Sequence, residues 1–464
     1  MDQNLAEKHL EVTLEINKLK IFYNSPLFLK GFFYFSRMEI ATIYNYFLQS
    51  TGIATDTRKI YANNMFVALK GDNFNGNKFA LSALENGAKF AIIDEIAYQL
   101  DERFILVENA LETLQKLANY HRNQLKITII GLTGSNGKTT TKELILAVLS
   151  QKYNTKATVG NLNNHIGVPL TLLSFDKTTE IGIVEMGANH QKEIEMLCGI
   201  CQPDFGYITN FGKAHLEGFG GTEGVIKGKS ELYDYLYSNQ KTAFVNTEDA
   251  IQKEKTKNIN SITFGLNTPE NFVSITKIET NPMVKIEFDN TIIQSHLIGL
   301  YNANNINAAI TIGKHFGVSN EKIKFGLENY IPNNNRSQLI EKNSNKIILD
   351  AYNANPSSMN AALTNFFQLN EKNKVAILGD MFELGIESSE EHKRLVEFCK
   401  NQTEMIFYFI GNDFFNHKNL NTNMNFYETF ESFQTNFTKL KTENSFLLIK
   451  GSRGMSLERT LEIL

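Results

Sequence analysis

The chain has few cysteines, no long apolar run and almost no net charge. Three cysteines in 464 residues are too few for a disulfide framework, which favours a reducing compartment, the cytoplasm. No segment reaches the eighteen or so uninterrupted apolar residues of a membrane helix, so we expect no membrane insertion. A formal net charge of -4 gives no basic surplus for nucleic acid. We expect small-molecule partners and a monomer.

Length and composition set the number of domains. The chain is two to four times as long as a usual domain, so two or three domains are expected. Hydrophobic residues at 42% and charged residues at 21% are ordinary for a globular protein and leave ample core.

Residues 1–37 have an unusual composition, and Met38 precedes the first stretch patterned like a domain. We interpret this leader as an upstream extension of the translated frame, poorly ordered or helical. The alternatives are a signal-like segment and a genuine added helix. Its most apolar part, Ser25 to Phe35, is short and contains Lys30.

A glycine-rich turn lies between two apolar patterns in the stretch from Lys126 to Tyr153. A short β-branched run before it predicts a buried strand, and the spacing after it predicts a helix. Gly131, Gly134 and Gly137 would let the backbone N–H groups face inward, toward an anion at the helix N-terminus. The order of strand, turn and helix predicts a phosphate site, whereas the alternative is a turn that binds nothing.

Two side chains in this turn have the chemistry of a P-loop. Lys138 would reach the β- and γ-phosphates, and the Thr139 hydroxyl would ligate Mg²⁺. The spacing departs from the strict P-loop pattern, because Leu132 stands where that pattern has glycine.

Polar residues follow the next two predicted strands. Glu185 comes at the carboxyl end of one, and His215 follows the other. Ligands gather at that edge of an open α/β sheet, and a buried carboxylate needs a partner such as a metal. We therefore predict that both residues converge with Thr139 on a metal, although a lone histidine is more often simply a packed or solvated residue.

Three weaker features stay open between a structural and a binding role. The asparagine-rich run at residues 158–169 could hold sugar hydroxyls or make Asx-turns. Asn302 and Asn305, one helical turn apart, could cap a helix or read a base edge. Arg58 could make a forked contact with a phosphate or carboxylate, or be solvated.

The apolar spacing of KGKSELYDYL predicts a helix from Lys227 to Leu236. Lys227 and Lys229 would lie near its start, where lysines are unfavourable for the helix dipole. Their position indicates a local anion, whereas the alternative is a solvated face.

Strand and helix patterns alternate along most of the chain, so the fold class is α/β. Residues 38–108 read as a small α/β domain. The central part carries the P-loop, and from about Ile331 a second doubly wound sheet begins, with Asp350, Asp380 and Lys450 at its strand ends.

Several strings occur in an order that is similar to the Mur ligase family, over residues 38–464. They are GLTGSNGKTTTKE, GNLNNHIGVPLTLL, VEMGANHQKEIE, NFGKAHLEGFGG, KGKSELY, GLYNANNINAA, DAYNANPSSM, LGDMFELG and LIKGSR. The irregular glycine spacing is itself a feature of this family. At Tyr301 the family commonly has histidine, so no binding role is assigned there.

The resemblance implies three domains: a UDP-sugar-binding domain at 38–108, a central ATP-binding domain at 109–331 and a C-terminal Rossmann-like domain at 332–464. It also implies roles for residues matched by motif. For the nucleotide these are Gly134, Ser135, Asn136, Gly137, Lys138, Thr139, Thr140, Asn305, Arg336 and Asp350. The residues implied for magnesium are Thr139, Glu185, His215 and, as a carbamate, Lys229. Those implied for catalysis are Lys138, His215 and Lys229. Those implied for binding the UDP-sugar peptide are Thr57, Arg58, Asn161, Asn163 and Asn164.

The implied activity is ATP-dependent amide formation through an acyl phosphate, releasing ADP and phosphate. Four of the strings are those expected of the members that add D-alanyl-D-alanine to UDP-N-acetylmuramoyl-tripeptide in peptidoglycan synthesis. The alternatives are a sibling adding a single amino acid, a folylpolyglutamate-type ligase and, from another class, a non-catalytic ATP-binding module.

Overall fold

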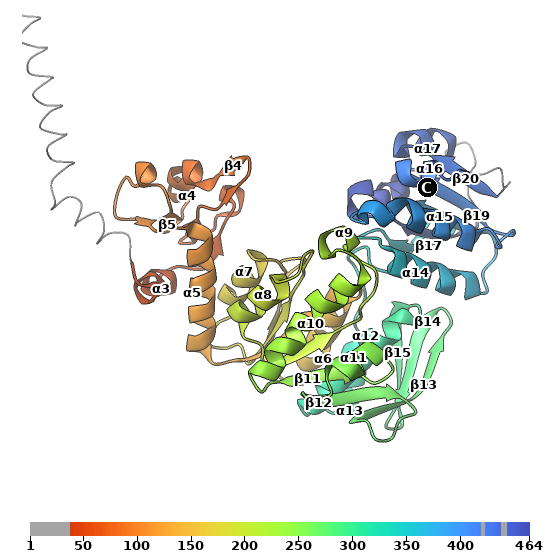
Figure 1. The fold of residues 1–464 in the computed structure, drawn as a ribbon, viewed down its shortest axis with the longest axis horizontal. Helices are drawn as coiled ribbons and strands as arrows, with labels where there is room; N and C mark the ends of the chain where they lie inside the picture. Colours follow the sequence, from red (N-terminus) through yellow and green to blue (C-terminus); the bar gives the residue numbers. More distant parts are fainter. Residues whose placement is uncertain (1–37, 419–422, 438–442) are drawn as a thin grey trace, which may run out of the picture. The chain divides into compact units, whose positions relative to one another are not determined.

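The computed structural model describes residues 38–418, 423–437 and 443–464 (Figure 1). The predicted extension at residues 1–37 lies outside this range. The described residues form two compact units, of which the first contains those up to Lys126 together with Leu172–Ser174, and the second contains the rest. Among the described helices, none has the length and apolar character needed to cross a membrane.

The first unit is a small α/β domain around a parallel sheet in the order β1-β2-β5-β6. Its strands are β1 (Ile53–Ala54), β2 (Met65–Val67), β5 (Phe90–Ile93) and β6 (Phe104–Leu106), with a separate hairpin of β3 (Lys70–Gly71) and β4 (Phe74–Asn75). Its helices are α3 (Ile40–Leu48), α4 (Ala80–Glu85) and α5 (Ala110–Leu125). Because α5 belongs to this unit, the predicted boundary at residue 108 falls just before a helix of the first unit. The predicted domain boundaries stay predictions.

The second unit contains a nine-stranded sheet in the order β15-β14-β13-β12-β11-β10-β7-β9-β8. The strands are β7 (Thr128–Thr133), β8 (Thr155–Ala157), β9 (Ile181–Glu185), β10 (Phe205–Ile208), β11 (Thr242–Asn246), β12 (Asn260–Leu266), β13 (Val273–Thr280), β14 (Met283–Phe288) and β15 (Thr291–Ile298). The helices of this part of the chain are α6 (Lys138–Leu149), α7 (Gly167–Leu173), α8 (Glu193–Cys201), α9 (Leu216–Phe219), α10 (Thr222–Ser238), α11 (Ala250–Lys255), α12 (Tyr301–His315) and α13 (Asn320–Glu328). The pairing is parallel from β8 to β13 and antiparallel from β13 to β15.

Helices cover both faces of this sheet. Apolar side chains of α6, α12 and α13 form one core with β7, β9 and β10, while α8 and α10 lie side by side on the other face (Figure 1). Since β10, β7 and β9 are parallel neighbours, their carboxyl ends open on one edge. One expectation was wrong: Gly131 lies within β7, where a Cβ would lie 2.9 Å from the Pro203 Cβ, so it serves packing and not the turn.

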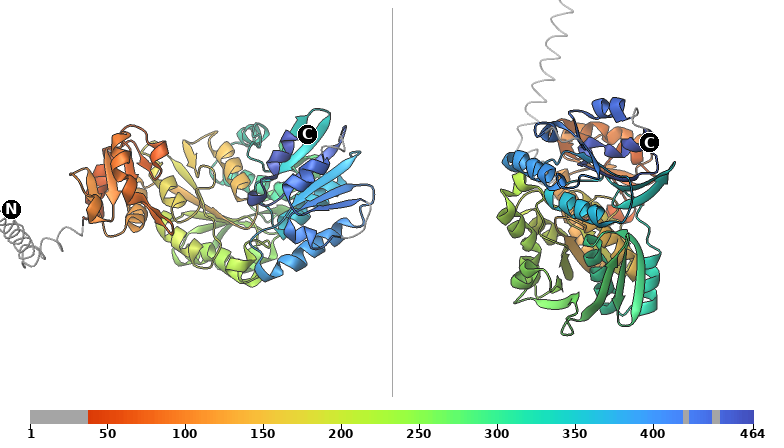
Figure 2. Two further views of the ribbon diagram at one scale, coloured as in Figure 1. Left: turned by 90° about the horizontal axis from the view of Figure 1, so that it is seen from above. Right: turned by 90° about the vertical axis from the view of Figure 1, so that its right-hand side faces the viewer.

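The second unit also contains a six-stranded sheet in the order β16-β17-β21-β18-β19-β20, parallel except for the β16–β17 pair. Its strands are β16 (Gln338–Lys342), β17 (Asn345–Asp350), β18 (Lys374–Gly379), β19 (Ile406–Ile410), β20 (Met424–Tyr427) and β21 (Phe446–Lys450). Its helices are α14 (Pro356–Gln368), α15 (Ser388–Cys399), α16 (Asn412–Phe415) and α17 (Phe430–Phe437). Figure 2 shows helices on both faces, as predicted for a doubly wound sheet.

Candidate active site

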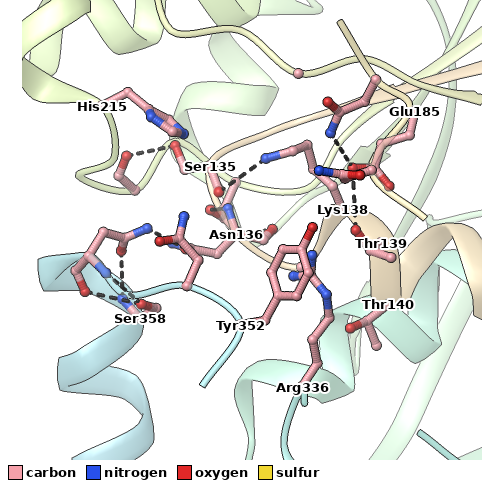
Figure 3. A pocket seen from close by; sticks show the side chains of 18 of the residues that line it. Ser135, Asn136, Lys138, Thr139, Thr140, Glu185, His215, Arg336, Tyr352 and Ser358 are labelled. Carbon is pink, nitrogen blue, oxygen red and sulfur yellow. Dashed lines mark hydrogen bonds between the residues drawn. The ribbon is translucent and has the colours of Figure 1, made fainter. Parts of the chain in front are cut away.

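A cavity of about 670 Å³ lies in the second unit, within the usual size range of small-ligand sites (Figure 3). Its wall combines the turn before α6, the ends of β9 and β10, the start of α12 and the C-terminal sheet. All the predicted nucleotide and metal residues except Gly134 and Lys229 line it directly. Those residues are Ser135, Asn136, Gly137, Lys138, Thr139, Thr140, Glu185, His215, Asn305, Arg336 and Asp350.

The turn before α6 is held in shape by the loop after β10. The backbone N–H groups of Ser135 and Asn136 donate to the Asn210 backbone oxygen at 3.0 Å and to its side-chain oxygen at 3.1 Å. The Thr209 hydroxyl donates to the Asn136 carbonyl at 2.6 Å. Gly134 has φ 139°, and a Cβ there would lie 2.0 Å from the Thr209 Oγ1, so only glycine fits.

Lys138 is the first residue of α6 and reaches back over the turn. Its ammonium donates to the carbonyls of Gly134 at 2.8 Å and Ser135 at 3.3 Å. The surrounding protein lowers the pKa of Lys138 by desolvation, the nearby Arg336 lowers it further, and the Glu185 carboxylate opposes this shift. A cation held mainly by backbone carbonyls at the wall of a cavity is well placed to meet an anion.

Glu185 ends β9 and is only 1% exposed. Its Oε1 accepts hydrogen bonds from the Asn163 amide at 2.8 Å and the Thr139 hydroxyl at 3.3 Å. Its Oε2 has no hydrogen-bond partner among the described residues, and the nearest cation, the Lys142 ammonium, is 4.0 Å away. A buried carboxylate oxygen without a donor is costly, and a divalent ion beside Thr139 would satisfy it.

These residues fit magnesium better than a metal held entirely by protein. The described residues contain no group of three or more His, Cys, Asp or Glu placed to hold a metal. Mg²⁺ is usually bound by one or two carboxylates together with substrate phosphates and water, which is the donor set that Thr139 and Glu185 leave room for.

His215 lies in the same cavity but contacts a residue that we did not predict. Its Nδ1 is in close contact with the Glu383 carboxylate, which lies on the loop after β18 of the C-terminal sheet. His215 itself is the residue preceding α9 and has φ 53°, the left-handed region. The structure therefore places the histidine at the predicted sheet edge, with its ring oriented by a second part of the chain.

Lys229 does not line the cavity. It lies in the middle of α10 and is 0% exposed. Its ammonium donates to the Ala188 carbonyl at 3.0 Å and lies 4.9 Å from the centre of the Phe219 ring. Burial, with a contribution from Lys138, lowers the pKa of Lys229 well below its ordinary value. The expectation that Lys229 lies near the helix start on a solvated face was wrong, because α10 begins at Thr222.

Asn305 packs against the turn before α6. Its side-chain oxygen accepts a hydrogen bond from the Thr141 hydroxyl at 3.0 Å, and its amide nitrogen donates to Asn302 at 2.9 Å. A Cβ on Gly137, which has φ 78°, would lie 2.7 Å from the Asn305 Oδ1. Asn305 therefore packs directly against the turn as well as lining the cavity.

Arg336 and Asp350 form the C-terminal wall. The Arg336 guanidinium carbon lies 3.7 Å from the centre of the Tyr352 ring, and its Nε is buried without a hydrogen-bond partner among the described residues (Figure 3). Asp350 accepts from the buried Lys450 ammonium at 2.6 Å and from the Ser337 backbone at 3.2 Å. The unpartnered guanidinium nitrogen is a donor available to a phosphate.

The predicted sugar-peptide residues divide between the two units. Asn161, Asn163 and Asn164 line the cavity, but the Asn164 side chain also accepts from the backbone of Gly167 at 2.9 Å. Thr57 and Arg58 belong to the first unit, where the exposed Arg58 pairs with Asp56 at 2.8 Å. Their predicted role in substrate binding stays a prediction.

Sequence reasoning missed the contacts between the two sheets of the second unit. The Asn355 amide donates to the Asn136 side chain of the turn at 2.7 Å, and the Lys213 ammonium pairs with Glu391 at 2.6 Å. Tyr352 was also missed. Asn355 and Tyr352 lie in the string DAYNANPSSM, but no local spacing links that string to a turn some 200 residues earlier.

Three family models match successive parts of the chain. They are "Mur ligase family, catalytic domain" at residues 49–122, "Mur ligase middle domain" at 132–313 and "Mur ligase, glutamate ligase domain" at 335–453.

Curated relatives and solved structures agree with these matches. The UDP-N-acetylmuramoyl-tripeptide--D-alanyl-D-alanine ligase of Bacillus subtilis is 36% identical, covering 74% of this chain and 76% of its own, and that of Treponema pallidum is 31% identical, covering 88% and 92%. MurF from Acinetobacter baumannii superposes with TM-score 0.79 at 32% identity, covering 88% and 92%. MurF from Thermotoga maritima in complex with ADP superposes with TM-score 0.78 at 28% identity, covering 90% and 97%. The three-domain α/β fold class is confirmed, and the chain belongs to the Mur ligase family.

Proposed function

We propose that this chain is an ATP-dependent ligase that joins D-alanyl-D-alanine to UDP-N-acetylmuramoyl-tripeptide, releasing ADP and phosphate, in the cytoplasmic stage of peptidoglycan synthesis. The observation that supports it most is the cavity that gathers Lys138 with the Glu185 Oε2 and the Arg336 Nε, two buried atoms that have no hydrogen-bond partner within the described part of the chain. The names of the curated relatives support the choice of substrates. We propose that the chain acts as a monomer.

The chemistry requires a carboxylate to become an electrophile. The γ-phosphoryl group of ATP passes to the terminal carboxylate of the tripeptide, which gives an acyl phosphate and ADP. The amine of D-alanyl-D-alanine then attacks the acyl carbon, the amide bond forms and phosphate leaves. In the first step negative charge builds on the phosphoryl oxygens. In the second step it builds on the oxygen of the acyl carbon and then on the leaving phosphate, while the attacking amine gives up one N–H proton. Lys138 and Arg336 are preorganised cations that would stabilise this charge.

Thr139, Glu185 and His215 are the residues that would hold Mg²⁺. When bound, the ion would supply positive charge to the phosphate oxygens without proton transfer. Among the protein residues, Asn163 and Thr139 orient the Glu185 carboxylate through their hydrogen bonds to its Oε1.

Lys229 would act as an anion and not as a cation. A buried amine with a depressed pKa is partly neutral, and its nitrogen can add to the carbon of CO₂. The N–C bond forms, one N–H proton leaves to solvent, and a carbamate results. That anion would lie among Lys138 and its neighbours, which explains why a lysine is buried beside other cations.

An amine panel tests the proposal. ADP release is measured with the full chain, ATP, Mg²⁺ and purified nucleotide tripeptide, with D-alanyl-D-alanine or single amino acids as acceptor. We expect ADP release that depends on the dipeptide. Stimulation by a single amino acid alone would instead indicate a sibling ligase, and ATP binding without acceptor-stimulated phosphate release would indicate a non-catalytic module.

A further inference from the structure

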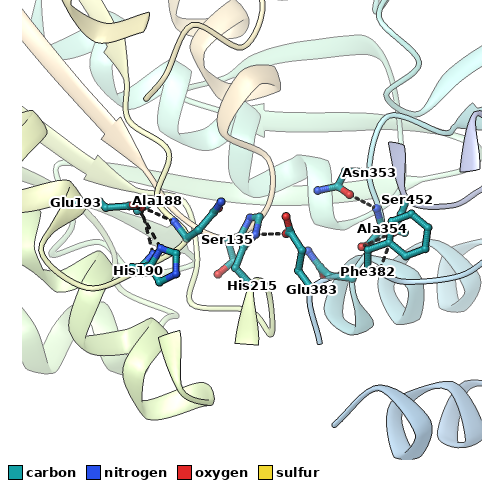
Figure 4. Close-up of polar contacts among 12 residues, drawn as sticks. Ser135, Ala188, His190, Glu193, His215, Asn353, Ala354, Phe382, Glu383 and Ser452 are labelled. Atoms are coloured by element: carbon teal, nitrogen blue, oxygen red, sulfur yellow. Dashed lines mark hydrogen bonds and ion pairs between the residues drawn. The ribbon is translucent and has the colours of Figure 1, made fainter. Parts of the chain in front are cut away.

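The contact between His215 and Glu383 joins the two sheets of the second unit. Glu383 lies on the loop between β18 and α15, and its carboxylate is in close contact with the His215 Nδ1 (Figure 4). The Glu217 backbone N–H donates to the Glu383 carbonyl at 3.3 Å. A Cβ on Gly385 would lie 3.1 Å from the Glu217 Cβ, so the two loops are packed closely together.

Both members of the pair have an uncommon backbone conformation. His215 has φ 53° and Glu383 has φ 62°, the left-handed region that non-glycine residues seldom adopt. Burial does not impose this on Glu383, whose side chain is 53% exposed. A strained backbone conformation persists only where the surrounding contacts fix it. Here it places two side chains from different sheets next to each other.

The contact has a specific chemical effect on the imidazole. Two lone pairs repel at so short a separation, so the Nδ1 beside the carboxylate carries the proton. A neutral ring in this tautomer keeps its lone pair on Nε2, which is the form that binds a metal. Metal-binding histidines nearly always donate their other ring nitrogen in this way, and the partner fixes both tautomer and ring orientation.

We propose that Glu383 is a positioning residue that holds His215 with Nδ1 protonated and Nε2 available to a divalent ion. Because Glu383 comes from the C-terminal sheet, the ion site is complete only when that sheet contacts the central one. This inference rests on the proposed role of His215 in the function above, and it couples cation binding to the docking of the C-terminal domain.

A second contact between the sheets supplies a matched control. Lys213, two residues before His215, pairs with Glu391 at 2.6 Å. Removing Glu391 therefore deletes one ion pair between the same two sheets, while the Asn355–Asn136 hydrogen bond still joins them and the imidazole is untouched. Glu383→Ala and Glu391→Ala differ in whether His215 loses its partner.

Mn²⁺ titration followed by electron paramagnetic resonance tests the proposal, with the full chain and a non-hydrolysable ATP analogue. Under saturating analogue we expect His215→Ala to lose one bound ion. Glu383→Ala should weaken binding of that ion by about 10- to 100-fold. Glu383→Gln should weaken it less, because an amide oxygen still accepts the Nδ1–H, and Glu391→Ala should bind like the parent.

The alternative outcomes separate this inference from the function it rests on. Unchanged Mn²⁺ binding in Glu383→Ala, with loss in His215→Ala, would overturn the positioning role alone. Unchanged binding in His215→Ala would overturn the assignment of His215 to the metal. If Glu391→Ala weakened Mn²⁺ binding as much as Glu383→Ala, contact between the two sheets and not ring orientation would determine Mn²⁺ affinity. If Glu383→Ala raised the KM for the dipeptide and kept normal Mn²⁺ affinity, Glu383 would belong to the acceptor site instead. Each of these two results would reject the positioning role of Glu383.

Discussion

Replacing Lys138 should separate catalysis from folding. The ammonium makes two hydrogen bonds to backbone carbonyls, at 2.8 and 3.3 Å, and lies at the wall of the cavity. Hydrogen bonds to a charged group contribute about 1.5–3 kcal/mol each, while desolvating an ammonium costs several kcal/mol. These terms oppose each other, so we expect Lys138→Ala to change the free energy of unfolding by less than about 2 kcal/mol without nucleotide.

The effect on turnover should be far larger. Loss of one preorganised donor at a developing oxyanion costs about 3–4 kcal/mol, or 10²- to 10³-fold in kcat. Lys138→Ala should therefore lower kcat for ligation by at least about 10²- to 10³-fold. Lys138→Met keeps the aliphatic stem, so a similar loss in that variant would assign the effect to charge and not to packing.

Two assays on the same preparation decide the matter. Coupled ADP release measures turnover, and thermal unfolding with and without ATP–Mg²⁺ measures binding, since ligand at a hundred times Kd stabilises by about 2.7 kcal/mol. Lys156→Ala, which removes a partly exposed ion pair with Asp176, is the control and should match the parent. A folded Lys138→Ala enzyme that keeps most of its turnover would refute the role of this lysine.

Three further substitutions test other parts of the site. Gly134→Ala should abolish ATP binding in a titration while the far-UV circular dichroism spectrum stays unchanged, because its Cβ would collide with Thr209; normal ATP affinity would contradict this. Lys229→Ala should lose turnover and regain part of it with added short carboxylates; an intact fold without rescue would count against the carbamate. Lys450→Met should destabilise the second unit by about 3–5 kcal/mol in urea unfolding, because Asp350 loses its buried partner. Adding Asp350→Asn to this variant should restore much of the lost stability. An unchanged urea midpoint in Lys450→Met alone would show that the ion pair does not stabilise the fold.

The parts of the site that could be predicted depend on short stretches of sequence. The site residues in the turn before α6 and at the ends of β9 and β10 could be predicted because each group comes where an apolar strand ends. Parallel strands bring these ends to one edge of the sheet. Thr139, Glu185 and His215 line one cavity for that reason.

The parts that could not be predicted depend on contacts between distant segments. Nothing in the sequence around Glu383 indicates that it meets His215, since the two positions belong to different sheets. The burial of Lys229 was missed for a related reason: the pattern located a helix but placed its start five residues late. Helix boundaries are less certain than helix existence when only periodicity is available.

The balance of charge in the cavity explains why these features occur together. Lys138 and Arg336 face it, while burial and the nearby Lys138 lower the pKa of Lys229, which favours the uncharged amine there. The Glu185 carboxylate accepts a hydrogen bond from Thr139, and its Oε2 has no hydrogen-bond partner among the described residues. The Lys138 and Arg336 cations repel each other, which costs folding free energy. A bound triphosphate would attract the same cations, so their electrostatic contribution would destabilise the protein without nucleotide and stabilise it with nucleotide bound.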